Sequence, residues 1–142
     1  MDEAAKAIRR TQIQNELRRI RHSRDDNTSA RNRLSNEIDD LQSTRHNLEN
    51  YIGHMINVEG KLNQCQHTAS PTDFSGGRRR RVESRISSTC NNVKNEVQRH
   101  NTNLERINRR ISDSRTKLEN LIATISRQSN RINELERELR NL

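Results

Sequence analysis

A heptad pattern in the second half of the chain constrains the fold more than any other feature. From residue 86 to residue 142, apolar residues recur in alternating steps of four and three, and 14 of these 17 positions are apolar. Such spacing places one apolar seam along a helix and is typical of a coiled coil. No Gly or Pro interrupts the pattern. We therefore predict one long helix over residues 78–142.

The first half carries the same pattern more weakly. Between residues 13 and 62, ten of the fifteen seam positions are apolar, and three of the polar ones cluster at Arg24, Asn27 and Arg31. Gly53 and Gly60 each cost about 1 kcal/mol relative to Ala inside a helix. We predict a first long helix over residues 1–67, with a weak point at residues 22–33.

The two seams share one antiparallel register. Their apolar residues pair so that the two residue numbers add to 155 or 156 throughout, as in Ile13–Leu142, Leu34–Leu121 and Leu62–Val93. The midpoint falls in the segment "SPTDFSGGRRRR", which holds the only Pro and two of the four Gly. The predicted fold is all-α, a long antiparallel two-helix coiled-coil hairpin with its turn at residues 68–77. The residues expected to form the turn are Pro71, Phe74, Gly76 and Gly77.

The register also predicts two cross-helix pairs. Asn27 faces Gln128, a polar layer that weakens packing but can fix the alignment of two helices. Cys65 and Cys90 come level near the turn and could form a disulfide, which would indicate an oxidising final location. The alternative is that both thiols remain free and pack as small apolar groups.

Composition and charge narrow the class of protein. Only 27% of residues are hydrophobic and 1% are aromatic, too few to fill a globular core. The formal net charge is +8, and residues 78–117 alone hold 12 basic and 4 acidic residues. A basic cluster opens this region and suggests an acidic protein partner, with nucleic acid as a less favoured alternative because base-stacking aromatic residues are missing. The cluster consists of Arg78, Arg79, Arg80 and Arg81.

Catalytic, metal and membrane signals are missing from the sequence. The five His are scattered and show no metal-ligand spacing with Cys, so we expect a non-enzyme without a cofactor or a metal site. No apolar run is long enough to span a bilayer, and no cleavable secretory signal stands at the N-terminus. We expect synthesis in the cytoplasm and, if the protein is exported, a route that needs no cleavable signal.

Some apolar residues lie off the seam, where a two-helix hairpin leaves them exposed. An exposed apolar stripe on a helix usually marks a binding site for a partner. Hydrophobic residues scattered over the surface without a partner would give the same number of exposed apolar side chains. We predict that they bind another helical protein, in a three- or four-helix arrangement. The off-seam residues are Tyr51, Ile56, Val58, Phe74, Val82 and Ile122.

The order helix, "SPTDFSG", helix resembles the helical-hairpin proteins of the Trp-x-Gly superfamily that bacterial type VII systems secrete. Within it, the chain is most similar to the small helical partners of LXG-type toxins. Phe74-Ser75-Gly76 would stand at the Trp-x-Gly turn, with Phe replacing Trp. The superfamily's C-terminal export motif, an aromatic residue followed four positions later by an acid, is absent, because Met55 follows the only Tyr at that spacing.

The resemblance implies a function. It predicts an adaptor or targeting chaperone that binds the helical N-terminal domain of a secreted LXG-type toxin for type VII export, with room for a second small helical partner. Synthesis would occur in the bacterial cytoplasm, followed by secretion. Two alternatives stay open from the residues alone: a cytoplasmic coiled-coil spacer or tether, and a basic coiled-coil protein that binds nucleic acid.

Overall fold

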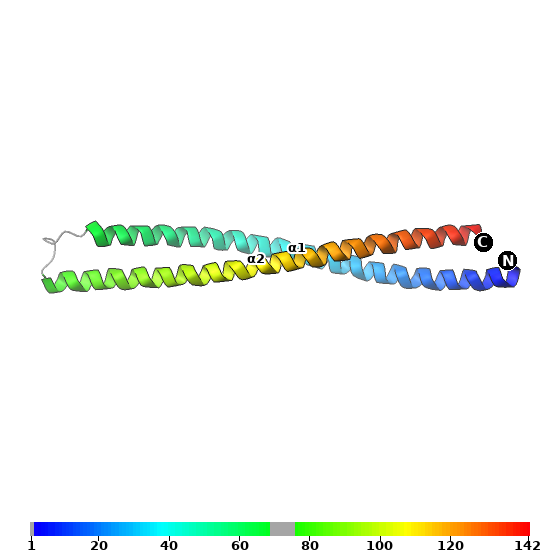
Figure 1. The fold of residues 1–142 in the computed structure, drawn as a ribbon, viewed down its shortest axis with the longest axis horizontal. Coiled ribbons are helices and arrows are strands. Elements are labelled where there is room, and N and C mark those ends of the chain that lie inside the picture. Colours follow the sequence, from blue (N-terminus) through cyan, green and yellow to red (C-terminus); the bar gives the residue numbers. More distant parts are fainter. Residues whose placement is uncertain (1, 69–75) are drawn as a thin grey trace. The chain divides into compact units, whose positions relative to one another are not determined.

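The computed structural model describes residues 2–68 and 76–142 and contains two helices packed against each other. Helix α1 spans Glu3–Thr68 and helix α2 spans Gly76–Asn141. The two helices lie side by side and antiparallel, with the two chain ends close together (Figure 1). The all-α helical hairpin expected from the heptads is therefore confirmed.

Local chemistry explains where the helices begin. The Asp2 carboxylate accepts a hydrogen bond from the Ala5 backbone N–H at 2.7 Å, which caps the first turn of α1. Helix α2 begins at Gly76, so Gly76 and Gly77 are helical and do not belong to the predicted turn. The N–H groups of this first turn have no acceptor within the helix itself. Pro71 and Phe74 lie outside the described residues.

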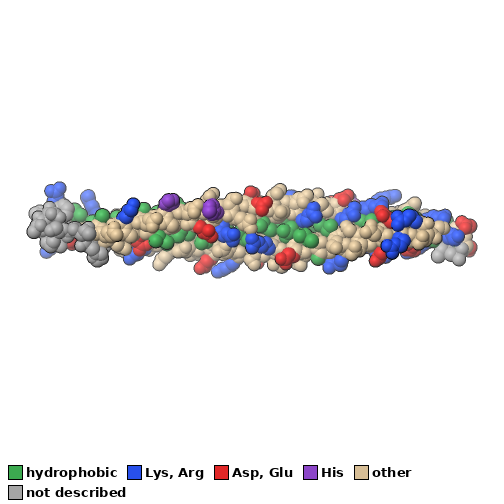
Figure 2. Space-filling model, turned by 90° about the horizontal axis from the view of Figure 1, so that it is seen from above, with side chains coloured by type: hydrophobic (Ala, Val, Ile, Leu, Met, Phe, Trp, Pro, Cys, Tyr) green, Lys and Arg blue, Asp and Glu red, His purple; other side chains and the backbone are tan. Residues whose placement is uncertain are grey.

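The seam predicted from the heptads is the core of the protein. Every described buried residue occupies a seam position. Apolar side chains follow the line between the helices, and charged side chains lie on both sides of it (Figure 2). Seam side chains of the two helices, all of them apolar except Ser114, thus account for the described buried interior. The buried residues are Ile13, Leu17, Ile38, Ile52, Cys90, Val93, Ile111, Ser114, Ile132 and Leu135.

The chain divides into two compact units that share the helices. Unit 1 comprises Met1–Asp40 and Ser112–Leu142, and unit 2 comprises Leu41–Ile111. In unit 1, one cluster joins Ile13, Leu17, Ile132 and Leu135, with further apolar side chains packed against it. These further residues are Ile20, Leu139 and Leu142, the partners that the register predicted.

The weak point expected at residues 22–33 does not interrupt α1. The Asn27 amide donates to Gln128 Oε1 at 3.2 Å, and Gln128 donates in turn to the Ser23 hydroxyl at 2.9 Å. Arg24 and Arg31 are half-buried, so their aliphatic stems can cover the seam while the charged ends reach water. The predicted polar layer therefore links the helices within unit 1.

Candidate partner-binding site

Large apolar side chains are exposed where the sequence expected a partner. Tyr51, Ile56 and Val58 are 44%, 51% and 44% exposed in unit 2, and Ile122 is 49% exposed in unit 1. Val82 is half-buried. Ile8, which is 62% exposed, was missed because the seam was read only from residue 13 onward. Extending the heptads to the N-terminus would have identified it as an off-seam residue.

The exposed residues of unit 2 divide between two sides of α1. At about 100° per residue, Val58 is turned only about 20° from Tyr51, whereas Ile56 is turned about 140°. With seam positions named a and d, Tyr51 and Val58 take position g and Ile56 takes position e. The residues predicted as one partner-binding set therefore do not form one patch.

The side that carries Tyr51 is organised around one carboxylate. The Tyr51 hydroxyl donates to Glu96 at 3.4 Å, and Arg99 donates to the same carboxylate at 2.6 Å. His100 Nε2 lies 3.9 Å from Glu96. The ring of Tyr51 meets that of His100 edge to face, with centroids 5.0 Å apart. We call the c and g positions of both helices in unit 2 the Tyr51 face.

A shallow groove runs along the Tyr51 face. Its lining includes the half-buried seam residues Leu48 and His100 and the exposed Tyr51. Because its lining is partly apolar and open to solvent, the groove can accept a side chain from another helix better than it can hold a small polar ligand. The lining residues are Thr44, Asn47, Leu48, Tyr51, Glu96, Arg99 and His100.

The opposite side of unit 2 has a different set of contacts. Lys94 lies 4.0 Å from Glu59, and Arg45 donates to Asn108 at 3.3 Å. Ile56 lies on this side, together with Gly53 and Gly60, and a Cβ added at either Gly would meet nothing within 4 Å. We call the b and e positions of both helices in unit 2 the Ile56 face.

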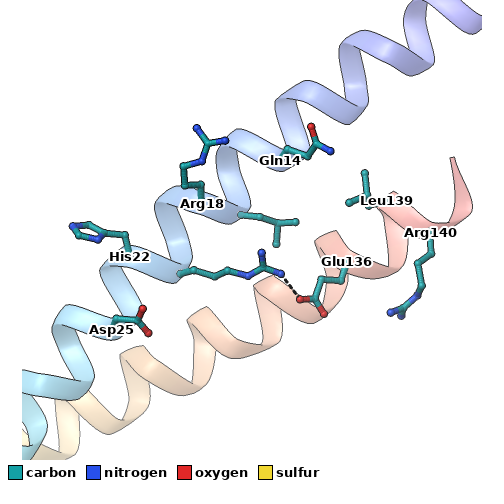
Figure 3. A pocket seen from close by; sticks show the side chains of 9 residues that line it. Gln14, Arg18, His22, Asp25, Glu136, Leu139 and Arg140 are labelled. Atoms are coloured by element: carbon teal, nitrogen blue, oxygen red, sulfur yellow. Dashed lines mark hydrogen bonds and ion pairs between the residues drawn. The ribbon is translucent and has the colours of Figure 1, made fainter.

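In unit 1, a polar groove lies near the chain ends (Figure 3). Arg21 donates to Glu136 at 2.5 Å across it. Arg18 and Arg140 point away from each other in Figure 3, so the cations do not converge on one point. Although it is rich in arginine, the groove is not built to hold an anion. The lining residues are Gln14, Leu17, Arg18, Arg21, His22, Asp25, Glu136, Leu139 and Arg140.

A second groove in unit 1 has an apolar floor. Its apolar lining residues are Ala30, Leu34 and Leu121. The exposed Ile122 follows Leu121 on α2. The walls carry both signs of charge, so the groove has no clear electrostatic preference. The remaining lining residues are Arg33, Glu37, Lys117 and Asn120.

Ion pairs hold the helices in register within unit 1. Arg9 donates to both carboxylate oxygens of Glu138, at 2.6 Å and 2.8 Å. These hydrogen bonds lower the pKa of Glu138 below its ordinary value of 4.5, and partial burial opposes the shift. Arg131 donates to Glu16 at 3.0 Å, and this bond is the largest cause of the raised pKa of Arg131. The side chains of both pairs remain partly exposed to solvent, so each pair contributes only modestly to stability.

The candidate disulfide between Cys65 and Cys90 is not formed in this structure. Both thiols are free; Cys90 is buried and Cys65 is exposed. Cys90 Sγ donates to Asn63 Oδ1 at 3.5 Å, so its neighbour across the seam is Asn63. Cys65 stands one residue before a seam position, and one residue turns a side chain by about 100°. Two residues at the same height along the two helices therefore need not have side chains that face each other.

The basic cluster projects into solvent as far as it is described. Arg78, Arg80 and Arg81 are exposed, and the side chain of Arg79 lies outside the described part. Cations at a helix N-terminus oppose the helix dipole. The cluster therefore costs some stability and contributes to the charge available to a partner.

The described residues show neither a metal-binding cluster nor a membrane-spanning helix. No group of three or more His, Cys, Asp or Glu side chains in residues 2–68 and 76–142 could hold a metal ion. In the same ranges, neither helix is long and apolar enough to cross a membrane. Comparisons of the chain with protein-family models, with curated proteins and with solved structures found no match.

Proposed function

We propose that the chain is a non-enzymatic adaptor that binds a helical segment of another protein by adding its hairpin to a helix bundle. The exposure of Tyr51, Ile56, Val58 and Ile122 on a hairpin with a single-seam core carries this proposal. A third helix laid along such side chains would remove them from water, at about 25 cal/mol per Å² of apolar area. The two helices of the described residues leave these side chains uncovered.

The resemblance to LXG-toxin partners supplies a finer version of the proposal. The bound segment would be the helical N-terminal domain of a secreted toxin, and the adaptor would deliver it to a type VII system from the bacterial cytoplasm. This version depends on the helix–turn–helix layout and on Phe74-Ser75-Gly76, which lies mostly outside the described residues. Export would then follow the toxin's signal or a composite surface of the complex.

The proposal is tested by recovering the partner. The tagged full-length chain is purified from its native host, washed at moderate and then high salt, and the retained proteins are identified by mass spectrometry. We expect a protein with a long helical segment to survive the high-salt wash, because apolar contacts are not screened. Self-association without a heterologous partner would instead indicate a spacer or tether.

A second candidate function is nucleic-acid binding. The exposure of Arg78, Arg80 and Arg81 and the net charge of +8 favour it. Binding through phosphates weakens steeply as salt rises. Nucleic acid that co-purifies at moderate salt and is lost at high salt, with no helical protein retained, would replace the adaptor proposal.

A further inference from the structure

The excess charge of the protein lies in unit 2. Residues 41–111 hold 12 basic and 5 acidic residues, a net charge of +7, whereas the rest of the chain holds 15 basic and 14 acidic residues. Unit 1 is thus nearly neutral. Any partner that is selected by charge would be selected by unit 2.

Within unit 2, the charge lies on one side. The c and g positions that make up the Tyr51 face hold six basic residues and one acidic residue, a net charge of +5. The b and e positions of the Ile56 face hold two residues of each sign and are neutral. The basic residues of the Tyr51 face are Lys61, Arg78, Arg85, Arg99, Arg106 and Arg110.

The one acidic residue of the Tyr51 face is already occupied. Glu96 accepts hydrogen bonds from Arg99 and from the Tyr51 hydroxyl. By contrast, the exposed Lys61 and Arg106 form no ion pair with any residue in the described ranges. The face therefore offers uncompensated positive charge beside two exposed apolar side chains, Tyr51 and Val58, spaced about 10 Å apart along α1.

We infer that the Tyr51 face is the docking site for an acidic amphipathic helix of another protein. The apolar stripe of that helix packs on Tyr51 and Val58, and its Glu or Asp residues lie beside Lys61 and Arg106. A second copy of this chain is a poor occupant, because its unit 2 carries the same positive face and its unit 1 is nearly neutral. A nucleic acid would meet the charge but would leave Tyr51 and Val58 uncovered. This inference depends on the adaptor function proposed above and names the chemistry of its partner.

The test uses the full-length chain and a synthetic helix. The probe is a labelled peptide about three heptads long, with Leu at a and d and Glu at the flanking positions. Two control peptides replace every Glu by Lys or every Leu by Ser, and a DNA duplex serves as a polyanion without apolar groups. Binding is followed by fluorescence anisotropy at physiological salt.

Matched variants locate the site. Val58→Ser should weaken binding of the Leu/Glu peptide by about tenfold or more, and Ile56→Ser, at a site of similar exposure on the other face, should leave it within about twofold. Reversing charge with Lys61→Glu and Arg106→Glu together should weaken binding, whereas Arg109→Glu, away from both faces, should not. Unchanged circular dichroism would show that each variant folds.

Four results would overturn the inference. Equal binding of the Leu-to-Ser peptide or of DNA would make the face a general polyanion surface. An Ile56→Ser variant that loses binding while Val58→Ser keeps it would move the site to the Ile56 face. Self-association that Val58→Ser abolishes would make a second copy the occupant. A helical partner that the host pull-down recovers equally with wild type and Val58→Ser would keep the adaptor function and refute only this site.

Discussion

Replacing Gly53 and Gly60 by Ala should stabilise the protein. Both residues lie inside α1, and a Cβ added at either would meet nothing within 4 Å. The gain then comes from backbone entropy and helix propensity alone, about 0.8–1.0 kcal/mol per site. The sites are seven residues apart, or about 10 Å along the helix, so their effects should add. We expect about 2 kcal/mol for the double variant.

Urea unfolding followed by far-ultraviolet circular dichroism measures this change. The midpoint should rise while the slope with denaturant stays constant, because the surface exposed on unfolding is unchanged. Gln98→Ala is the matched control, at an exposed position of α2 in the same unit. Gln and Ala differ little in helix propensity, so the control should move the unfolding free energy by only about 0.5 kcal/mol or less.

Two results would refute this reasoning. An unchanged unfolding free energy in the double variant would mean that residues near 53–60 do not stay helical in solution. A loss of stability would mean that the added methyl groups meet another chain, since the protein itself leaves the space open. A stabilised variant should still bind the acidic peptide, because both glycines lie on the Ile56 face.

Three further predictions concern individual side chains. Cys65 should react with a thiol reagent in the native protein, while the buried Cys90 should react only when the protein unfolds. Equal reaction rates for the two thiols, or no free thiol before a reductant is added, would contradict an exposed free Cys65 and a buried free Cys90. The pKa of Glu138 is lowered in the folded protein, so its pair with Arg9 contributes stability at pH values above the ordinary pKa of 4.5, and this stability is lost as the pH falls through the folded-state pKa. Glu138→Gln should therefore lower the melting temperature at neutral pH but not in strong acid. An equal change in melting temperature at both pH values would exclude the ion pair. Leu135→Ala, at a fully buried seam position, should cost about 2–5 kcal/mol in urea unfolding, and a cost near that of an exposed site would contradict the seam.

Much of the fold could be predicted from residue spacing. The cluster of Ile13, Leu17, Ile132 and Leu135 follows from two heptad seams and one antiparallel register. Heptads indicate it because an apolar stripe that recurs every 3.5 residues packs against the matching stripe of a second helix in a coiled coil. The contact between Asn27 and Gln128 follows from the same register.

The candidate site could be predicted only in part. Off-seam spacing identified Tyr51, Ile56 and Val58 as exposed, and the charge count identified the basic half of the chain. The distance of a residue from the seam says how deep its side chain lies but not on which side of the hairpin it falls, so exposure alone does not separate Tyr51 and Val58 from Ile56. The basic Tyr51 face and the neutral Ile56 face separate only when heptad positions e and g are distinguished.

The sequence by itself determined that this chain is an all-α hairpin with a narrow seam, because periodicity sets which stripe of each helix is buried. Only the tertiary structure decided which contacts the side chains outside the seam make. In the structure, the Cys65 and Cys90 thiols are free, and Cys90 donates a hydrogen bond to the Asn63 amide oxygen. Tyr51, Arg99 and His100 lie around the Glu96 carboxylate. The reason is angular: one residue turns a side chain by about 100° around its helix, so contacts across a hairpin depend on rotation and side-chain conformation that seam spacing does not specify.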